Sequence, residues 1–379
     1  MRSCPSLALP FALALAGCID APHPGDTGQP DSAADTSADL GTDALPDTDV
    51  QFPDAQDSAT DARPDARPDA PRDVAMGPTF CSTGTTPPGA IVPAGFCVRQ
   101  FSPHTQTPRV PGAVDAPRTM AFASNGHLFV AAPANGTPGG SGAGPGAILV
   151  ITDANHDNVG ETHTFAAGIP DVHGLAVADD AVYFTTIAGV WRTDYAPGQL
   201  VEVPSSRRQI AALTNSSWRW THGLARSVGG RLYVTSGVYG ATCPDPNVGS
   251  VSEVTASGLR LVAQGFRNPM YARCHFRDEV CAVDELGDDG GGGWGAREKM
   301  VLLRDATDYG FPCCATTGVV VPGSSASCAS VTTEESEMPL SDTPFGLDWE
   351  RGLWPAPYDG GVFVAKHGSF YSTPPWRAV

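Results

Sequence analysis

Acidic side chains gather in the segment CAVDELGDD, which holds four carboxylates within residues 284–289. Carboxylate oxygens are the hard ligands that Ca²⁺ prefers, and two carboxylates a residue or two apart on a loop can converge on one ion. Asp288 and Asp289 run into a glycine stretch and suit a solvated loop. We therefore expect Asp284 and Glu285 to be the metal ligands.

A second acidic run contains Asp153, Asn155, Asp157 and Glu161, with the DxNxDN spacing of a calcium loop. It lacks the glycine at the sixth position and the glutamate at the twelfth. We interpret this run as the polar tip of a hairpin.

The elements that must position these side chains recur along the chain as strand, turn, strand. The units start at Ala121, Gly174, Gly223, Ala272 and Gly346, which lie 53, 49, 49 and 74 residues apart. A period of about 50 residues is typical of propeller blades, and the 3.6-residue apolar period of helical repeats is absent. We predict an all-β, six-bladed β-propeller; a β-sandwich is the alternative, but it does not predict the repeated register. The longest spacing holds an insertion around residues 313–328.

The first eighteen residues have the pattern of an export signal. Arg2 precedes an apolar stretch over residues 7–16, which is too short to cross a bilayer. The motif LAGC at residues 15–18 resembles the lipobox of bacterial lipoproteins, whose cysteine is lipidated and becomes the new N-terminus. We predict lipidation at Cys18 and a lipid-anchored protein of the cell envelope, at the outer membrane or the periplasmic face. Plain secretion is the alternative.

Residues 19–76 are rich in Asp, Ala and Pro and predict a disordered linker. This segment holds 14 Asp, no Glu and 3 Arg, so it carries −11 of the chain's net charge of −18. Its apolar surface is too small to offset the entropy of ordering it. The folded domain then spans residues 77–379. Neither part offers the basic surface that phosphate binding requires, which argues against a nucleic-acid partner.

Cysteine usage agrees with an exported protein. With Cys4 in the signal and Cys18 lipidated, an even number remains in the folded part: Cys81, Cys97, Cys243, Cys274, Cys281, Cys313, Cys314 and Cys328. No CxxC pair with zinc spacing occurs, so disulfides are favoured. We expect the pairs 81–97 and 274–281, with one of the adjacent cysteines 313 and 314 bonded to 328 and the other to 243.

Over residues 95–379 the order of several segments resembles the glucose/sorbosone dehydrogenases. The resemblance implies a six-bladed propeller that uses pyrroloquinoline quinone (PQQ) and calcium to oxidise sugars or sugar aldehydes. This sequence stops ten residues after Ser369, where family members continue. We therefore expect a last blade that N-terminal strands complete or that is truncated. The matching segments are APRTMAFASNGHLFVA, HGLAVADDAVYFTT, GFRNPMYA, VDELGDD, DYGFP and FGLDWERGLWPAPYDGGVFVAKHGSF.

The resemblance also implies roles for individual residues. The RNP turn places Arg267 and Asn268 on the oxygens of the quinone, where a guanidinium forks onto carboxylates; the alternative is an arginine that closes a turn on backbone carbonyls. Lys366 and His367 are the charged candidates from the last blade. The family has an acidic turn with calcium near it at the position of Asp284 and Glu285.

The catalytic base departs from the family pattern. In the glucose dehydrogenase branch a histidine takes the hydroxyl proton and an aspartate orients it, but matching on Leu224 puts Arg219 and Val238 at these positions. An arginine stays protonated and cannot act as a general base. His222, three residues later, is our candidate, with a turn histidine as the alternative. The other candidate imidazoles are His173 and His367.

Two hypotheses for the function follow. The first is a membrane-tethered, PQQ- and calcium-dependent dehydrogenase of a sugar or aldehyde, with a respiratory carrier as electron acceptor. The second is a catalytically degenerate propeller that binds a glycan or a protein. The altered base favours the second hypothesis, whereas the RNP turn and the DELGDD segment favour the first.

Overall fold

The computed structural model describes part of the compact unit Met76–Val379. The described residues are 98, 101–102, 117–133, 146–157, 159–213, 222–238, 243–244, 248–287, 298–316, 319–321, 324–339, 343–352, 354 and 358–366. The predicted signal, linker and lipidation site fall outside them, and so do Cys81, Cys97, Arg219 and His367.

Four sheets make up most of the described chain, each built on four consecutive or nearly consecutive antiparallel strands; one of them gains a fifth, parallel strand. We number them as blades. Blade 1 is β1 (Met120–Phe122), β2 (Leu128–Ala132), β3 (Ala147–Thr152) and β4 (Glu161–Ala167); blade 2 is β5 (Leu175–Ala178), β6 (Ala181–Thr186), β7 (Gly189–Asp194) and β8 (Arg208–Ala212). Blade 3 is β9 (Leu224–Arg226), β10 (Leu232–Ser236), β11 (Gly249–Thr255) and β12 (Gly258–Phe266). Blade 4 is β13 (Asn268–Cys274), β14 (Cys281–Leu286), β15 (Glu298–Leu302) and β19 (Ser336–Met338).

The strands β20 (Pro344–Trp349) and β21 (Val362–Lys366) pair with each other and begin a fifth blade. The predicted repeat is confirmed, because each of its five starting residues lies in, or directly before, the first strand of a blade. The fold is an all-β propeller. The described residues contain four complete blades and this fifth pair, so the number of six stays a prediction.

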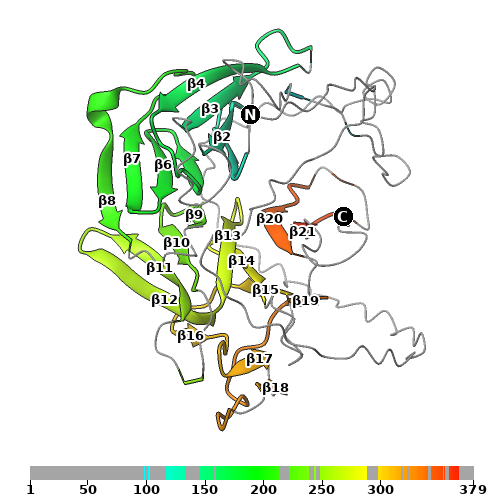
Figure 1. Cartoon of the computed structure of the whole chain (residues 1–379). Helices are drawn as coiled ribbons and strands as arrows, with labels where there is room; N and C mark the ends of the chain where they lie inside the picture. The colour runs from blue at the N-terminus through cyan, green and yellow to red at the C-terminus, as the bar shows by residue number, and fades with distance from the viewer. Residues whose placement is uncertain are drawn as a thin grey trace, which may run out of the picture. The chain divides into compact units, whose positions relative to one another are not determined.

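The first strands of the blades surround a common centre. Contacts join β1 to β5, β5 to β9, β9 to β13 and β13 to β20, and Figure 1 shows the blades following one another around these inner strands. Side chains fill the centre: the rings of His173 and Tyr271 lie 5.4 Å apart and those of Tyr271 and Phe345 6.3 Å apart. Arg273 Nη2 donates to Met120 O (2.7 Å), which ties blade 4 to blade 1.

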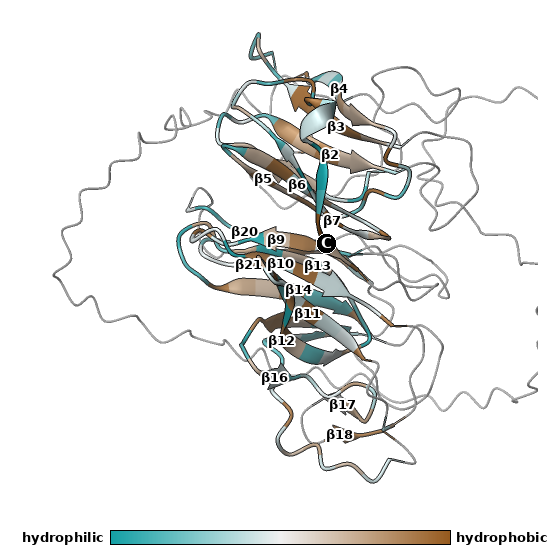
Figure 2. Cartoon of the chain, turned by 90° about the vertical axis from the view of Figure 1, so that its left-hand side faces the viewer, coloured by the Kyte–Doolittle hydropathy of each residue, from teal (hydrophilic) through white to brown (hydrophobic). Residues whose placement is uncertain are grey.

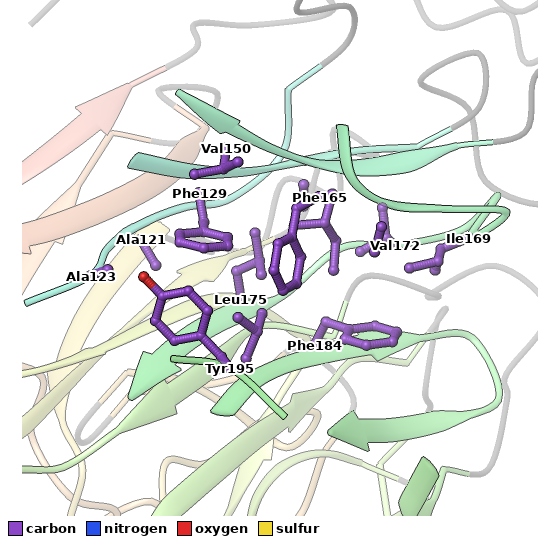
Figure 3. Packing of buried hydrophobic residues seen from close by; sticks show 14 residues of the cluster. Ala121, Ala123, Phe129, Val150, Phe165, Ile169, Val172, Leu175, Phe184 and Tyr195 are labelled. Atoms are coloured by element: carbon purple, nitrogen blue, oxygen red, sulfur yellow. The ribbon is translucent and has the colours of Figure 1, made fainter. Parts of the chain in front are cut away.

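Buried hydrophobic clusters join neighbouring sheets, and Figure 2 shows the hydrophobic residues of the strands in brown. Between blades 1 and 2 the ring of Phe129 packs edge-to-face on Phe165 and Tyr195, with centroid distances of 5.1 and 5.3 Å (Figure 3). Leu175 and Phe184 of blade 2 belong to the same buried cluster. Successive residues of a strand point to opposite faces of its sheet, so the blades share an apolar cluster at each of their first three junctions.

A glycine directly precedes the inner strand of blades 2 and 3, because the backbone of the next blade lies against this position. A Cβ atom at Gly174 would lie 2.5 Å from the carbonyl oxygen of His222, and one at Gly223 would lie 2.5 Å from that of Met270. These close approaches explain why the repeat places glycine at this point.

Gly174→Ala is therefore expected to lower the free energy of unfolding by about 1–3 kcal/mol, because the added methyl group forces two blades apart. Urea denaturation of the variant measures the loss. Gly361→Ala is the matched control, since a Cβ at Gly361 would meet no atom within 4 Å. Equal denaturation midpoints for the two variants would contradict the close packing of the inner strands.

An insertion between β15 and β19 accounts for the longest repeat spacing, as predicted. Its strand β16 (Thr307–Asp308) pairs in parallel with β12, and β17 (Cys314–Thr316) forms a hairpin with β18 (Val319–Val320). The only helical turn among the described residues is the 3₁₀ helix Pro204–Ser206 in blade 2. In that part of the chain no helix is long and apolar enough to span a membrane.

Three disulfides confirm predicted pairings. Cys274–Cys281 closes the turn between β13 and β14, Cys314–Cys328 closes the insertion, and Cys243–Cys313 ties the insertion to the segment after β10. The fourth predicted pair falls outside the described residues.

Candidate functional site

The candidate site residues lie at one end of the inner strands. In blades 3, 4 and 5 the start of the first strand pairs with residues at or near the end of the second strand. The pairs are Leu224 with Val234, Asn268 with Leu286 and Pro344 with Lys366. We call this end of the propeller the site end. His222 precedes β9, Arg267 and Asn268 stand at the start of β13, Asp284 and Glu285 lie near the end of β14, and Lys366 ends β21.

His222 is a buried imidazole with one nitrogen anchored. Its Nδ1 lies 2.8 Å from the carbonyl oxygen of Thr235, which can only accept, so Nδ1 carries the proton and Nε2 keeps its lone pair. Nε2 is buried and has no hydrogen-bond partner among the described residues. Burial lowers the pKa of His222 below 6.5, against the carbonyl bond of Thr235 and the charge of Asp171, which raise it. His222 is thus an imidazole that is held in a fixed direction and favours its neutral form.

Hydroxyl groups join the inner strands of blades 2 and 3 just beside His222. The N–H of Gly174 donates to Thr185 Oγ1 (2.7 Å), and this hydroxyl donates to the carbonyl oxygen of His222 (2.5 Å). One blade on, the N–H of Gly223 donates to Thr235 Oγ1 (2.7 Å). The same polar position near the end of the second strand therefore fixes the backbone around His222 from both sides.

Arg267 and Asn268 are held between the ends of β10 and β14. The N–H of Arg267 donates to Glu285 Oε1 (2.6 Å), and its guanidinium Nη1 donates to the carbonyl oxygen of Gly287. Both residues are buried, with exposed fractions of 6% and 2%. Gly237 at the end of β10 makes room for the Asn268 side chain, because a Cβ there would collide with Asn268 Oδ1.

Asp284 occupies in blade 4 the position that Thr185 and Thr235 occupy in blades 2 and 3. Its Oδ1 accepts the N–H of Tyr271 (2.8 Å) in its own blade, and its Oδ2 accepts the N–H of Gly346 (2.9 Å) in the fifth blade. Ala365, which follows Val364, takes the corresponding position in the fifth blade, so that position carries no side-chain acceptor there. A hydroxyl can accept one N–H and donate to a carbonyl at the same time, whereas the two oxygens of a carboxyl group can each accept one N–H.

The predicted metal pair does not come together. Asp284 and Glu285 are neighbours within strand β14, not on a loop, so their side chains leave opposite faces of the sheet. Glu285 Oε2 is buried and has no hydrogen-bond partner among the described residues, while Lys299 is its cross-strand neighbour on β15. Within the described ranges no three His, Cys, Asp or Glu side chains converge on a common point.

The remaining candidates are placed as follows. His173 lies before β5 at the position that His222 takes before β9, and burial, with the charge of Arg118, lowers its pKa to about 3. Lys366 is half-buried at the last position of β21. Asp153 and Asp157 form a turn between β3 and β4, in which Asp153 Oδ1 accepts the N–H of Asp157 (3.0 Å). The interpretation of this run as a hairpin tip is confirmed.

Sequence reasoning missed Thr185 and Thr235. A signal for them exists: aligning the repeats places Thr185, Thr235 and Asp284 in one column, near the end of an apolar second strand. A polar residue repeated at a buried strand position needs a partner, which indicates a shared hydrogen bond.

Solved structures with the same fold include several sugar-oxidising proteins. A carbohydrate-active enzyme of family AA12 from Trichoderma reesei, a calcium structure, has a TM-score of 0.55 and 16% identity over 70% of this chain and 76% of that chain. The holo PQQ domain of pyranose dehydrogenase from Coprinopsis cinerea has a TM-score of 0.55 and 16% identity over 72% of this chain and 79% of that chain. A glucose dehydrogenase gives 0.52 and 15% over 67% and 80%.

No family model matches the sequence, and no curated protein matches it. At identities of 15–16% the likeness to these structures establishes the fold. This chain is therefore similar in architecture to the propellers of PQQ-dependent sugar dehydrogenases.

Proposed function

We propose that the chain is a quinone-dependent dehydrogenase of a sugar or sugar aldehyde. The observation that carries the proposal is His222, a neutral imidazole whose Nδ1 is bonded to the Thr235 carbonyl and whose buried Nε2 lacks a partner among the described residues. A general base needs an unprotonated acceptor atom held in a fixed direction. His222 meets this requirement at the site end of a propeller whose structural neighbours include a pyranose dehydrogenase PQQ domain and a glucose dehydrogenase.

The donor groups at the site end have the chemistry that an anionic quinone such as PQQ requires. Arg267, Asn268 and Lys366 share the site end with His222 and would hold the carboxylates and carbonyl oxygens of the quinone. PQQ would supply the two-electron acceptor for a hydride from the substrate carbon. The task of the chain is to take the hydroxyl proton of the sugar at His222 Nε2 and to keep that imidazole neutral by burial.

We also propose that calcium binds, with Glu285 and not Asp284 as its carboxylate ligand from the predicted pair. Both oxygens of Asp284 accept backbone N–H groups, so Asp284 fits a structural role. Glu285 Oε2 is the buried carboxylate oxygen without a partner among the described residues, and it fits a cation ligand better. We derive no step of the reaction from the ion.

Isothermal titration calorimetry of the full chain with PQQ, in the presence and absence of Ca²⁺, tests the proposal directly. We expect binding with a Kd below about 100 μM, together with oxidation of an aldose or aldehyde by the loaded protein. No binding in this range would overturn the proposal.

Arg267→Lys tests the assignment of the quinone contact. The lysine keeps the positive charge but loses the planar fork of donors, so the affinity for PQQ is expected to fall at least tenfold, about 1.4 kcal/mol. Calorimetry of variant and wild type gives the ratio. A fall in the melting temperature without cofactor and an unchanged Kd would instead make Arg267 a structural residue, which bonds Gly287 O to close the turn.

The burial of the site favours one other function. His222, Arg267 and Asn268 are all less than 7% exposed, which suits a propeller that keeps these residues for its fold and binds a glycan or protein elsewhere. Quinone binding without turnover of any aldose or aldehyde would select this alternative.

For both functions we propose that Cys18 anchors the protein in the cell envelope and that residues 19–76 act as its tether. For the dehydrogenase we propose a respiratory carrier as the electron acceptor.

A further inference from the structure

The carbonyl group of His222 is fixed by the preceding blade. Thr185, at the end of β6 in blade 2, donates its hydroxyl to His222 O at 2.5 Å and accepts the N–H of Gly174 at 2.7 Å. Thr185 is fully buried, so solvent does not compete for these two bonds in the wild type.

The imidazole of His222 depends on this anchor for its direction. In blade 2 the backbone N–H of His173 donates to Thr185 O (3.0 Å), whereas in blade 3 the carbonyl oxygen of the equivalent Thr235 takes the imidazole Nδ1 of His222 (2.8 Å). Two equivalent histidines are thus held differently. The bond from Thr185 holds the main chain of His222 against blade 2, while its ring reaches Thr235 in blade 3.

We propose that Thr185 is a positioning residue for the base His222: its hydroxyl, acting across the junction of blades 2 and 3, fixes the main chain from which the imidazole reaches Thr235 O. The inference rests on the proposed function for its catalytic consequence. The structural part of the inference is that the Thr185 hydroxyl controls the tautomer and the pKa of the His222 imidazole. This effect can be measured without any reaction.

The experiment compares Thr185→Val with Thr185→Ser in the full chain labelled with ¹⁵N-histidine. The valine keeps the size of the side chain and removes the hydroxyl, while the serine restores it. NMR of the imidazole nitrogens, with the His222 signals assigned from His222→Gln, reports the tautomer and the pKa of the ring. We expect wild type and Thr185→Ser to hold the Nδ1–H tautomer with a pKa below 6.5. Asp171 and His173 are the titratable groups near this ring, and no variant changes them.

In Thr185→Val the released segment admits water, and we expect mixed tautomers and a pKa that rises toward 6.5. In the loaded enzyme kcat should fall at least tenfold with KM within twofold, and the acidic limb of the rate profile should move to higher pH. Thr185→Cys, which keeps a weak donor, is expected to lie between valine and serine and serves if the valine variant does not fold.

Thr193→Val is the matched control. Thr193 is a fully buried threonine of the same blade, and its hydroxyl bonds Ser206 Oγ (2.9 Å) at β7, away from the inner strand. This variant should lose stability but keep the His222 tautomer, pKa and kcat. The proposal is overturned if Thr185→Val leaves all three unchanged, or if Thr193→Val changes them equally. A wild type without dehydrogenase activity would overturn the proposed function alone, because the NMR comparison still decides the role of Thr185.

Discussion

Replacing His222 by glutamine is expected to lower kcat of the PQQ-loaded enzyme by about 10² to 10⁴, the usual contribution of a general base. Glutamine can still donate an N–H toward Thr235 O, so this hydrogen bond within blade 3 should persist, but it has no basic nitrogen at the position of Nε2. Steady-state kinetics with an aldose as substrate measure the loss, and the melting temperature checks that the fold survives.

The pH dependence of the wild type gives an independent check on His222. Only the neutral imidazole accepts a proton, and burial holds its pKa below 6.5. The rate should therefore stay on its plateau as the pH falls through 6.5 and should decline only at more acidic values. His163→Gln, on the outer strand of blade 1, is the control and should leave the profile intact. If the His222→Gln variant kept its activity, the general base would be another residue.

Asp284→Asn is expected to destabilise the fold by about 1–3 kcal/mol or more, because one buried N–H, of Tyr271 or of Gly346, would face the amide NH₂ and lose its acceptor. Chemical denaturation at several pH values measures the change. Asp359→Asn, on an exposed turn, is the matched control and should lie within about 0.5 kcal/mol of wild type. A wild-type midpoint for Asp284→Asn would show that the two N–H bonds of Asp284 do not stabilise the junction of blades 4 and 5.

The sign of the pH effect follows from the burial of Asp284. Burial raises its pKa from 3.8 to about 8, against the two backbone N–H bonds, which lower it. The folded protein thus keeps a proton that the unfolded chain releases above pH 3.8. The stability due to this proton is complete below pH 3.8, declines as the pH rises toward 8 and is constant above. The asparagine variant should lack this decline, so its deficit relative to wild type should be largest in acid.

The repeat could be predicted from the sequence because its cause is local. A glycine before an apolar strand, as at Gly174 and Gly223, marks the place where two inner strands touch, and each strand follows from its own residues. The disulfide Cys274–Cys281 was equally accessible, since it closes a short turn.

The chemistry of Asp284 could not be predicted in the same way. Its partners, Tyr271 and Gly346, are 13 and 62 residues away, and one belongs to another blade. The expectation of a loop with two converging carboxylates was wrong because apolar residues on both sides carry β14 through Leu286. Likewise nothing local in the sequence shows that Thr185 contacts His222, which lies 37 residues further on.

The hydrogen bonds between blades 2 and 3 and between blades 4 and 5 also have a consequence for the order of the blades. Thr185 offers a proton to a carbonyl of the following blade, whereas Asp284 offers a lone pair to an N–H of the blade after it. A copy of blade 3 inserted after blade 4 would bring a Gly223 whose N–H is already bound to its own Thr235, and Asp284 Oδ2 would be buried with no donor. The donors and acceptors at a junction must therefore match, and this requirement fixes which blade can follow which. Blades of similar fold cannot replace one another in the ring.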